Sequence, residues 1–156
     1  MISFDIGAYR FQVRAAAIFV WNESVLLHRL VGEDFWALPG GRADPGEHAS
    51  TTVVREMREE LDEAVTCGPL AFVVENFFEH RGQPNHELGF YFRATLADDS
   101  RLLDAACSHR GAEGDQALEF RWFALAGIAA IDLRPSFLRA ALVETSTGCH
   151  HIVQRG

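Results

Sequence analysis

The sequence lacks lysine altogether and contains little cysteine. All 14 basic residues of the 156-residue chain are arginines, which excludes a lysine nucleophile, a Schiff base and the lysine of a P-loop. The three cysteines (Cys67, Cys107 and Cys149) lie far apart, and no Cys-x-x-Cys pair is present. Neither a disulfide framework nor a structural zinc site is therefore expected, and the cysteine usage favours a reducing compartment.

Long apolar runs and an excess of positive charge are also missing. No stretch approaches the roughly 18 apolar residues of a membrane span, and no long apolar run begins the chain, so a cytoplasmic protein without a membrane partner is expected. The chain has 22 acidic residues and a net charge of −8. Because a general binder of duplex nucleic acid needs a basic face, duplex nucleic acid is not expected as a partner. An acidic protein can still act on a polyanion when divalent metal ions lie between the two.

What the composition does contain is typical of one folded domain. Hydrophobic residues make up 48% and charged residues 23% of the chain, as in globular proteins. The length fits a single domain over residues 1–156, and no linker or internal repeat divides it. A chain of this size buries roughly 70% of its unfolded surface and needs no disulfide or metal to hold it together.

Local patterning predicts an α/β fold in which a mixed β-sheet is sandwiched between helices. Segments rich in apolar β-formers predict strands, and they cover residues 14–21, 25–29, 70–78, 87–96 and 118–123. Helical patterns cover residues 48–61, a turn at 125–130 and a C-terminal helix that begins near Pro135. A polar loop is expected at residues 97–116, and the tail around Cys149-His150-His151 is expected to be flexible.

The helix predicted at residues 48–61 carries the most informative pattern. On a wheel of about 100° per residue, one stripe is apolar and faces a core, with Val54, Met57 and Leu61 as its members and Val53 at its edge. Three carboxylates fall within about 100° of arc on the other side, and they are Glu56, Glu59 and Glu60. Like charges at this spacing repel and weaken a helix.

Such an acidic face has two interpretations. On most helices it is simply a solvated surface. Here the helix follows a break at Pro39-Gly40-Gly41, and Arg55 and Arg58 are interleaved with the acids, so the charges are not a plain solubilising block. Magnesium binds one or two protein carboxylates together with substrate phosphates. The Glu-x-x-Glu-Glu face therefore predicts a site for a hard divalent cation.

The spacing around this helix resembles the Nudix box, G-x5-E-x7-R-E-U-x-E-E-x-G-U, where U is a bulky apolar residue. Seven positions match at fixed spacing, and they are Gly41, Glu47, Arg55, Glu56, Met57, Glu59 and Glu60. The end of the box departs from the pattern, because Asp62 stands where the family has glycine and Glu63 where it has an apolar residue. That glycine ends the helix, so Asp62 either caps the helix differently or lets it continue.

The resemblance implies the αβα sandwich of the Nudix fold and a magnesium-dependent hydrolase, with manganese as an alternative to magnesium. The bond cleaved would be a phosphoanhydride in a nucleoside diphosphate linked to another group, so the partner would be a small nucleotide-like molecule. The metal ligands implied are Glu56, Glu59, Glu60 and a carbonyl of the Gly40-Gly41 loop, with Gly41 as the box residue. Arg55 would hold Glu47 or Glu56 in place through a charge-assisted pair.

The general base stays open among Glu56, Glu87 and Glu119. Family members differ in whether the base lies inside the box or on a later loop. Glu87 and Glu119 each lie at the start of a predicted strand, where a solvated strand end is an equally ordinary interpretation.

Residues that bind the substrate are expected outside the box. Arg29 and Arg42 are candidates for holding a phosphate, and Phe35 and Phe78 are candidates for stacking on a base or sugar. The ordinary alternatives are solvated arginines and core aromatic residues. The box handles the diphosphate and not the attached group, so it does not identify the substrate.

Two rival functions follow from the same residues. The first is a non-catalytic Nudix-fold module that senses a nucleotide-like metabolite. Such modules typically lose a box carboxylate, whereas Glu56, Glu59 and Glu60 are all present. The second is an acidic calcium-binding helix, which lacks here the Asp-rich loop with a central glycine that calcium hands require. The oligomeric state is open, a homodimer included.

Overall fold

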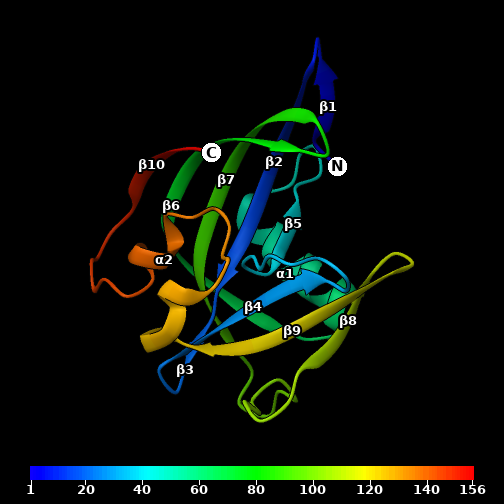
Figure 1. Ribbon diagram of the computed structural model, residues 1–156. Coiled ribbons are helices and arrows are strands. Elements are labelled where there is room, and N and C mark those ends of the chain that lie inside the picture. Colours follow the sequence, from blue (N-terminus) through cyan, green and yellow to red (C-terminus); the bar gives the residue numbers. More distant parts are fainter.

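The computed structural model describes residues 1–156 and contains two β-sheets (Figure 1). The larger sheet has the strand order β1 (Ser3–Ile6), β2 (Tyr9–Ile18), β7 (Gln83–Leu96), β6 (Val65–His80) and β10 (His150–Arg155), with β5 (Gly40–Arg42) also paired to β2. Because β2 and β7 run parallel while β6 and β7 run antiparallel, this sheet is mixed, as predicted.

The smaller sheet lies against one end of the larger one (Figure 1). Its strand order is β3 (Val20–Trp21), β4 (Ser24–Leu30), β9 (Gln116–Ala124) and β8 (His109–Glu113). The only break in the strand predicted at residues 14–21 comes at Phe19, where the chain leaves β2 for β3 and so passes from one sheet to the other.

Alternation along β2 places a helix on each side of the larger sheet. Successive strand residues point to opposite faces. Ala15 and Ala17 therefore pack in a core with Met57 of α1 (Ala49–Leu61), while Ala16 and Ile18 pack in a second core. That second core is closed by η1 (Leu125–Ala130) and α2 (Leu138–Ala141). The predicted arrangement of a mixed sheet between helical layers is thus confirmed.

The helix of the box ends cleanly without its usual glycine. Asp62 takes the left-handed conformation with φ 55°. Its N–H donates to the carbonyl of Arg58 at 3.0 Å, and the N–H of Glu63 donates to the carbonyl of Met57 at 3.3 Å. These bonds satisfy carbonyls at the end of the helix in the way a glycine cap would. Of the two outcomes left open by the sequence, Asp62 caps the helix rather than extending it.

Three local predictions are wrong. Residues 97–116 are not all loop, because residues 109–113 form β8 against β9. The tail at His150 and His151 is not flexible coil but the start of β10, which pairs with the edge strand β6 and satisfies its free backbone groups. The C-terminal helix shrinks to the single turn of α2, because the chain must turn back to reach β10.

The predicted burial of side chains along α1 is also partly wrong. Val53 is fully buried at the centre of the apolar stripe, whereas Val54 is 39% exposed. Glu56 and Glu60 do not lie on the face opposite the core, because both are buried beside that stripe, and only Glu59 is exposed. No helix of this structure combines the length and apolar character needed to cross a membrane.

Candidate active site

Arg55 forms hydrogen bonds to three of the box carboxylates. Its guanidinium donates to Glu47 from Nε at 2.8 Å and from Nη2 at 3.0 Å. Its Nη1 donates to Glu56 at 2.9 Å and to Glu59 at 3.1 Å, and Nη2 also reaches the carbonyl of Arg42. One arginine therefore holds three box carboxylates, and it places both Glu47 and Glu56 where the resemblance implied only one of them.

The charge of Glu47 is stabilised by this geometry. Hydrogen bonds from Arg55 lower the pKa of Glu47 to about 2, against the opposing effect of its burial, and the Thr52 hydroxyl adds a further bond. Glu47 thus stays ionised at any ordinary pH and locks the loop before α1 to the helix.

For Glu56 and Glu60, the effect of burial outweighs the nearby positive charge. Burial and the neighbouring Glu56 carboxylate raise the pKa of Glu60 to about 9, and burial also raises the pKa of Glu56 against the pull of Arg55. The buried Oε2 of Glu60 has no hydrogen-bond partner. A pair of buried acids with an orphaned oxygen is short of positive charge, which a divalent cation would supply. The donor set, all oxygen, suits magnesium or manganese.

The carboxylates are not a ready-made cage. No group of three or more His, Cys, Asp or Glu side chains is already arranged around an ion position. Glu59 instead points its carboxylate to Arg55. Magnesium is ordinarily held by one or two carboxylates with substrate phosphates completing its shell, and the pair Glu56 and Glu60 meets that smaller requirement.

Strand β5 brings the start of the box next to these acids. Gly41 pairs with Ala15, and a Cβ placed on Gly41 would lie 2.3 Å from Cδ of Glu56. Only glycine allows the Glu56 carboxylate to approach the backbone so closely. The neighbours Gly40 and Arg42 face the opposite way and line a pocket, so β5 links the carboxylates to that pocket.

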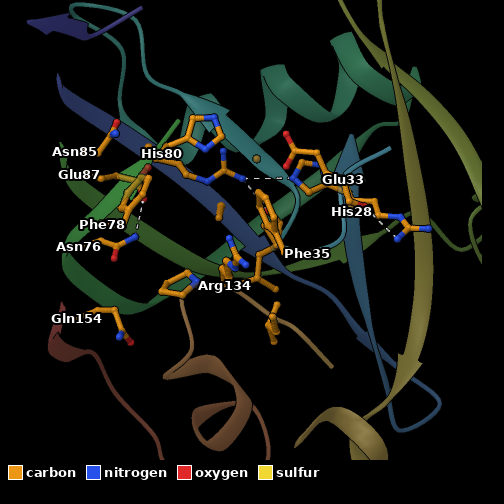
Figure 2. A pocket seen from close by; sticks show the side chains of 18 of the residues that line it. His28, Glu33, Phe35, Asn76, Phe78, His80, Asn85, Glu87, Arg134 and Gln154 are labelled. Atoms are coloured by element: carbon orange, nitrogen blue, oxygen red, sulfur yellow. Dashed lines mark hydrogen bonds between the residues drawn. The ribbon is translucent and has the colours of Figure 1, made fainter. Parts of the chain in front are cut away.

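The pocket has a volume of about 420 Å³ and lies on the face of the larger sheet that α1 does not cover (Figure 2). Side chains from β2, β4, β6 and β7 form its walls, together with the segment 132–136. All four residues predicted to bind substrate line it, namely Arg29, Arg42, Phe35 and Phe78. Their presence in one cavity of ligand size supports a binding role.

Two of these residues are already engaged by neighbours. Arg29 donates to Glu119 at 3.0 Å and lies 4.4 Å over the ring of Trp36. The guanidinium of Arg134 lies 4.3 Å over the ring of Phe35, and Figure 2 shows this pair in the middle of the pocket. Trp36 itself is buried in the core and does not line the pocket.

The three candidates for the general base occupy three different environments. Glu56 lies beside Gly41 and Glu60 on the α1 side. Glu87 is 5% exposed and lines the pocket, where it accepts hydrogen bonds from Gln12 and Asn76. Glu119 is paired with Arg29 and Arg121 and does not line the pocket. The structure therefore brings Glu56 and Glu87 to the site and leaves Glu119 outside it.

Sequence reasoning missed Arg14, which lies between the pocket and the box. Its Nη2 donates to the carbonyl of Leu38 at 2.8 Å and lies 3.5 Å from Nε2 of His28. Its positive charge lowers the pKa of Glu60 against the larger effects of burial and Glu56. Burial and this same charge lower the pKa of His28 to about 3, so His28 is neutral. The signal that could have identified Arg14 is its position as a single charged residue directly before the apolar run Ala15-Ala16-Ala17.

Glu113 was also missed. It lies at the end of β8 and lines the pocket, and its charge contributes to the raised pKa of Glu60. It belongs to the segment 97–116 that was interpreted as loop, so nothing in the sequence placed it near the box.

Comparisons with known proteins agree with this site. A family model described as "NUDIX domain" matches residues 11–141. A Bacillus subtilis (strain 168) protein whose proposed activity is that of an 8-oxo-dGTP diphosphatase is 47% identical over 49 residues. That match spans 30% of this chain and 33% of the relative, so about a third of the relative's length is covered.

Solved structures share the fold across most of the chain. The MutT protein of Bacillus halodurans superimposes with a TM-score of 0.64 at 20% identity, covering 90% of this chain and 89% of that one. A NUDIX hydrolase from Nitrosomonas europaea gives a TM-score of 0.61 at 22% identity, covering 91% and 77%. With the family model matching well over half of its residues, the chain belongs to the NUDIX family.

Proposed function

We propose that this protein is a magnesium-dependent pyrophosphohydrolase that cleaves a phosphoanhydride bond in a nucleoside diphosphate linked to another group. The observation that carries the proposal is the buried pair Glu56 and Glu60 beside Gly41, with one Glu60 oxygen left unpartnered. A pocket lined by arginines adjoins this pair across β5. Manganese is the alternative metal.

The residues that would hold the metal are Glu56, Glu60 and the Gly41 carbonyl, with Glu59 joining once its carboxylate leaves Arg55. When bound, the ion would neutralise phosphate charge and make a water molecule more acidic. Arg55 acts as a positioning residue, because its bonds to Glu47 and Glu56 fix both carboxylates relative to the helix.

Arg14 and Arg42 are the arginines best placed for the phosphates. They are register partners on β2 and β5, so their side chains lie side by side in the pocket wall. Neither forms an ion pair within the protein, in contrast to Arg29, which Glu119 neutralises. Two adjacent, uncompensated guanidinium groups beside the carboxylate pair match a diphosphate bridged to the protein by a cation.

Glu56 is our candidate for the general base. It lies beside the other box carboxylates, and Arg55 holds its carboxylate in place. Glu87 lies in the pocket but is bonded to two amides, which suits a binding role better.

A nucleotide as substrate is supported by the Bacillus subtilis relative, whose proposed substrate is a nucleoside triphosphate. The alternative function, a non-catalytic binding module, has less support because every box carboxylate is present and Glu56 and Glu60 are buried together. Burying these two acids together costs stability, because Arg55 bonds to Glu56 but one oxygen of Glu60 has no partner, and a module that only binds a metabolite has no need of that cost.

The test is a panel of nucleoside triphosphates, sugar nucleotides, dinucleoside polyphosphates and coenzymes, assayed with magnesium and with manganese for the nucleotide product of phosphoanhydride cleavage. Glu60→Gln serves as the inactive variant, and Glu144→Gln, an exposed residue beyond α2, is the matched control. Hydrolysis by the wild type and by Glu144→Gln, but not by Glu60→Gln, is expected. Binding of a panel compound without any turnover would favour the binding module instead.

A further inference from the structure

A row of three polar side chains crosses the pocket floor. Gln12 of β2 is the register partner of Glu87 of β7, and Glu87 is in turn the partner of Asn76 of β6. Each is at most 7% exposed, and all three line the pocket. Figure 2 shows Glu87 and Asn76 facing each other on one side of the cavity. Buried polar groups normally have hydrogen-bond partners, so any donor or acceptor of this row that lacks a partner indicates where a ligand could bind.

The row contains more acceptors than donors can satisfy. Glu87 accepts from Nε2 of Gln12 and, at 3.5 Å, from Nδ2 of Asn76. No arginine or histidine forms a salt bridge with Glu87, although an ionised carboxylate offers about four acceptor positions. Because Nε2 of Gln12 is directed to Glu87, its Oε1 is left buried without a donor. A ligand that meets this row must therefore bring N–H or O–H donors.

The surroundings of the row favour a nucleobase over a sugar. The backbones of the three strands lie about 4.8 Å apart, and the amide groups of Gln12 and Asn76 both turn towards the Glu87 carboxylate. Asn85 and Phe78 form the next row on the same sheet face, and both line the pocket. Phe78 thus offers an aromatic ring beside the polar row, the surface on which a base stacks.

Among the common bases, guanine matches a carboxylate flanked by a free amide oxygen. Its N1–H and N2 amino group are adjacent donors that one carboxylate can accept together. Adenine and cytosine place a ring acceptor beside the amino group, which would face Glu87 with like polarity. Hypoxanthine keeps N1–H but lacks the amino group. A comparison of guanine with hypoxanthine therefore measures the contribution of the hydrogen bond from the amino group.

We infer that the row Gln12–Glu87–Asn76 reads the base of the nucleotide and selects guanine-type bases, in which a ring N–H lies next to an exocyclic amino group. This inference rests on the proposed function for the identity of the ligand as a nucleotide. Arg14 lies two residues from Gln12 on the same face of β2, about 7 Å along the strand. A base on the row thus leaves its phosphates directed to Arg14, Gly40 and the box.

The test is equilibrium binding of nucleoside monophosphates by calorimetry, without divalent metal and therefore without turnover. We expect the wild type to bind dGMP at least about tenfold more tightly than dIMP or dAMP, the usual worth of one hydrogen bond to a charged group. In Glu87→Gln, the dGMP and dIMP affinities should fall within about twofold of each other, because an amide cannot accept two donors as a carboxylate does. The ratio of GMP to dGMP affinity should not change.

The control is Glu75→Gln, which makes the same substitution one residue before Asn76, where the half-buried side chain lies outside the pocket and is hydrogen-bonded to His151. It should keep the wild-type preference. Equal wild-type affinities for dGMP and dIMP would overturn the inference without any variant, even if Glu87→Gln did not fold. A Glu87→Gln variant that changed the GMP to dGMP ratio instead would assign the carboxylate to the ribose and also overturn it.

These outcomes are separate from failure of the proposed function. Hydrolysis of panel compounds without a guanine preference overturns the base-reading role alone. Selective dGMP binding by a protein that hydrolyses nothing overturns the hydrolase and leaves the base-reading row in place. Absence of binding by all four monophosphates overturns the inference and removes its support for a nucleotide substrate.

Discussion

The two faces of the larger sheet each carry buried glutamates, but these glutamates have different neighbours. On the α1 face, Glu56 and Glu60 are buried together, and an oxygen of Glu60 has no partner. On the pocket face, Glu87 is equally buried but accepts bonds from two amides. We propose that the first arrangement binds a cation, whereas the second accepts hydrogen bonds from a ligand. Burial alone therefore does not define a carboxylate's role; its neighbours do.

The largest expected difference between the two faces is their response to removal of the divalent metal. We expect chelation to abolish turnover, and added magnesium or manganese to restore it, because the cations that act on the buried pair Glu56 and Glu60 are Arg55 and Arg14, and they do not offset its burial. Binding of dGMP to the pocket face should survive chelation. The measurement is hydrolysis and calorimetric binding on the same sample, before and after chelator. Full turnover in excess chelator would remove the basis for a metal role.

The next largest effect on turnover should come from neutralising a single glutamate on the α1 face. Glu60→Gln and Glu59→Gln each remove a charged oxygen, and we expect turnover to fall about 10²–10⁴-fold, since metal stabilisation of charge is worth several kcal/mol. Glu60→Gln should also raise the melting temperature of the metal-free protein, because it removes a buried acid from beside Glu56. Near-normal turnover in both variants, measured at saturating magnesium, would refute the assignment.

Comparing glutamates on the two faces locates the base. Glu56→Gln should lose about 10²–10⁴-fold in turnover at saturating substrate, the usual worth of a general base. Glu87→Gln should change the choice of nucleotide with little loss of turnover, and Glu119→Gln should do neither. A loss concentrated in Glu87→Gln at saturating guanine nucleotide would move the base to the pocket face. Equal, modest losses in all three would leave the base outside this set.

The α1 face could be predicted from sequence because its spacing is local. Gly41, Glu47 and Arg55 lie within one loop and one helix, so fixed intervals along the chain place them in space. Even so, the wheel misjudged which valine is buried, because Val53 and Val54 are adjacent and only the packing on β2 and β5 distinguishes them.

The pocket face could not be predicted in the same way. Gln12, Asn76 and Glu87 are separated by 64 and 11 residues, and they meet only through the registers of β2, β7 and β6. The same holds for Arg29 and Glu119, which are register partners on β4 and β9 and so form an ion pair. A sequence pattern indicates that a strand exists, but not which residue lies opposite which. The role of Glu119 depended on that missing information.

The smallest expected effect concerns stability on the α1 face. Glu47 has its pKa lowered to about 2 by Arg55, below the ordinary value of 4.5. A group with a lowered pKa adds stability above its unfolded value and loses it as pH falls through the folded value. The difference in unfolding free energy between wild type and Glu47→Gln should thus be constant above about pH 5 and shrink between pH 4.5 and 2.

Denaturant unfolding of both proteins across pH 2–7 measures this difference. The pocket face supplies the comparison, since Glu87 is bonded to neutral amides rather than to a guanidinium. Glu47→Gln removes the negative charge and one of the two oxygens that accept from Arg55, and Arg55 keeps its bonds to Glu56 and Glu59, so part of the loss is recovered locally. A difference that is independent of pH down to 2 would show that Arg55 holds Glu47 by shape alone and that its charge contributes nothing.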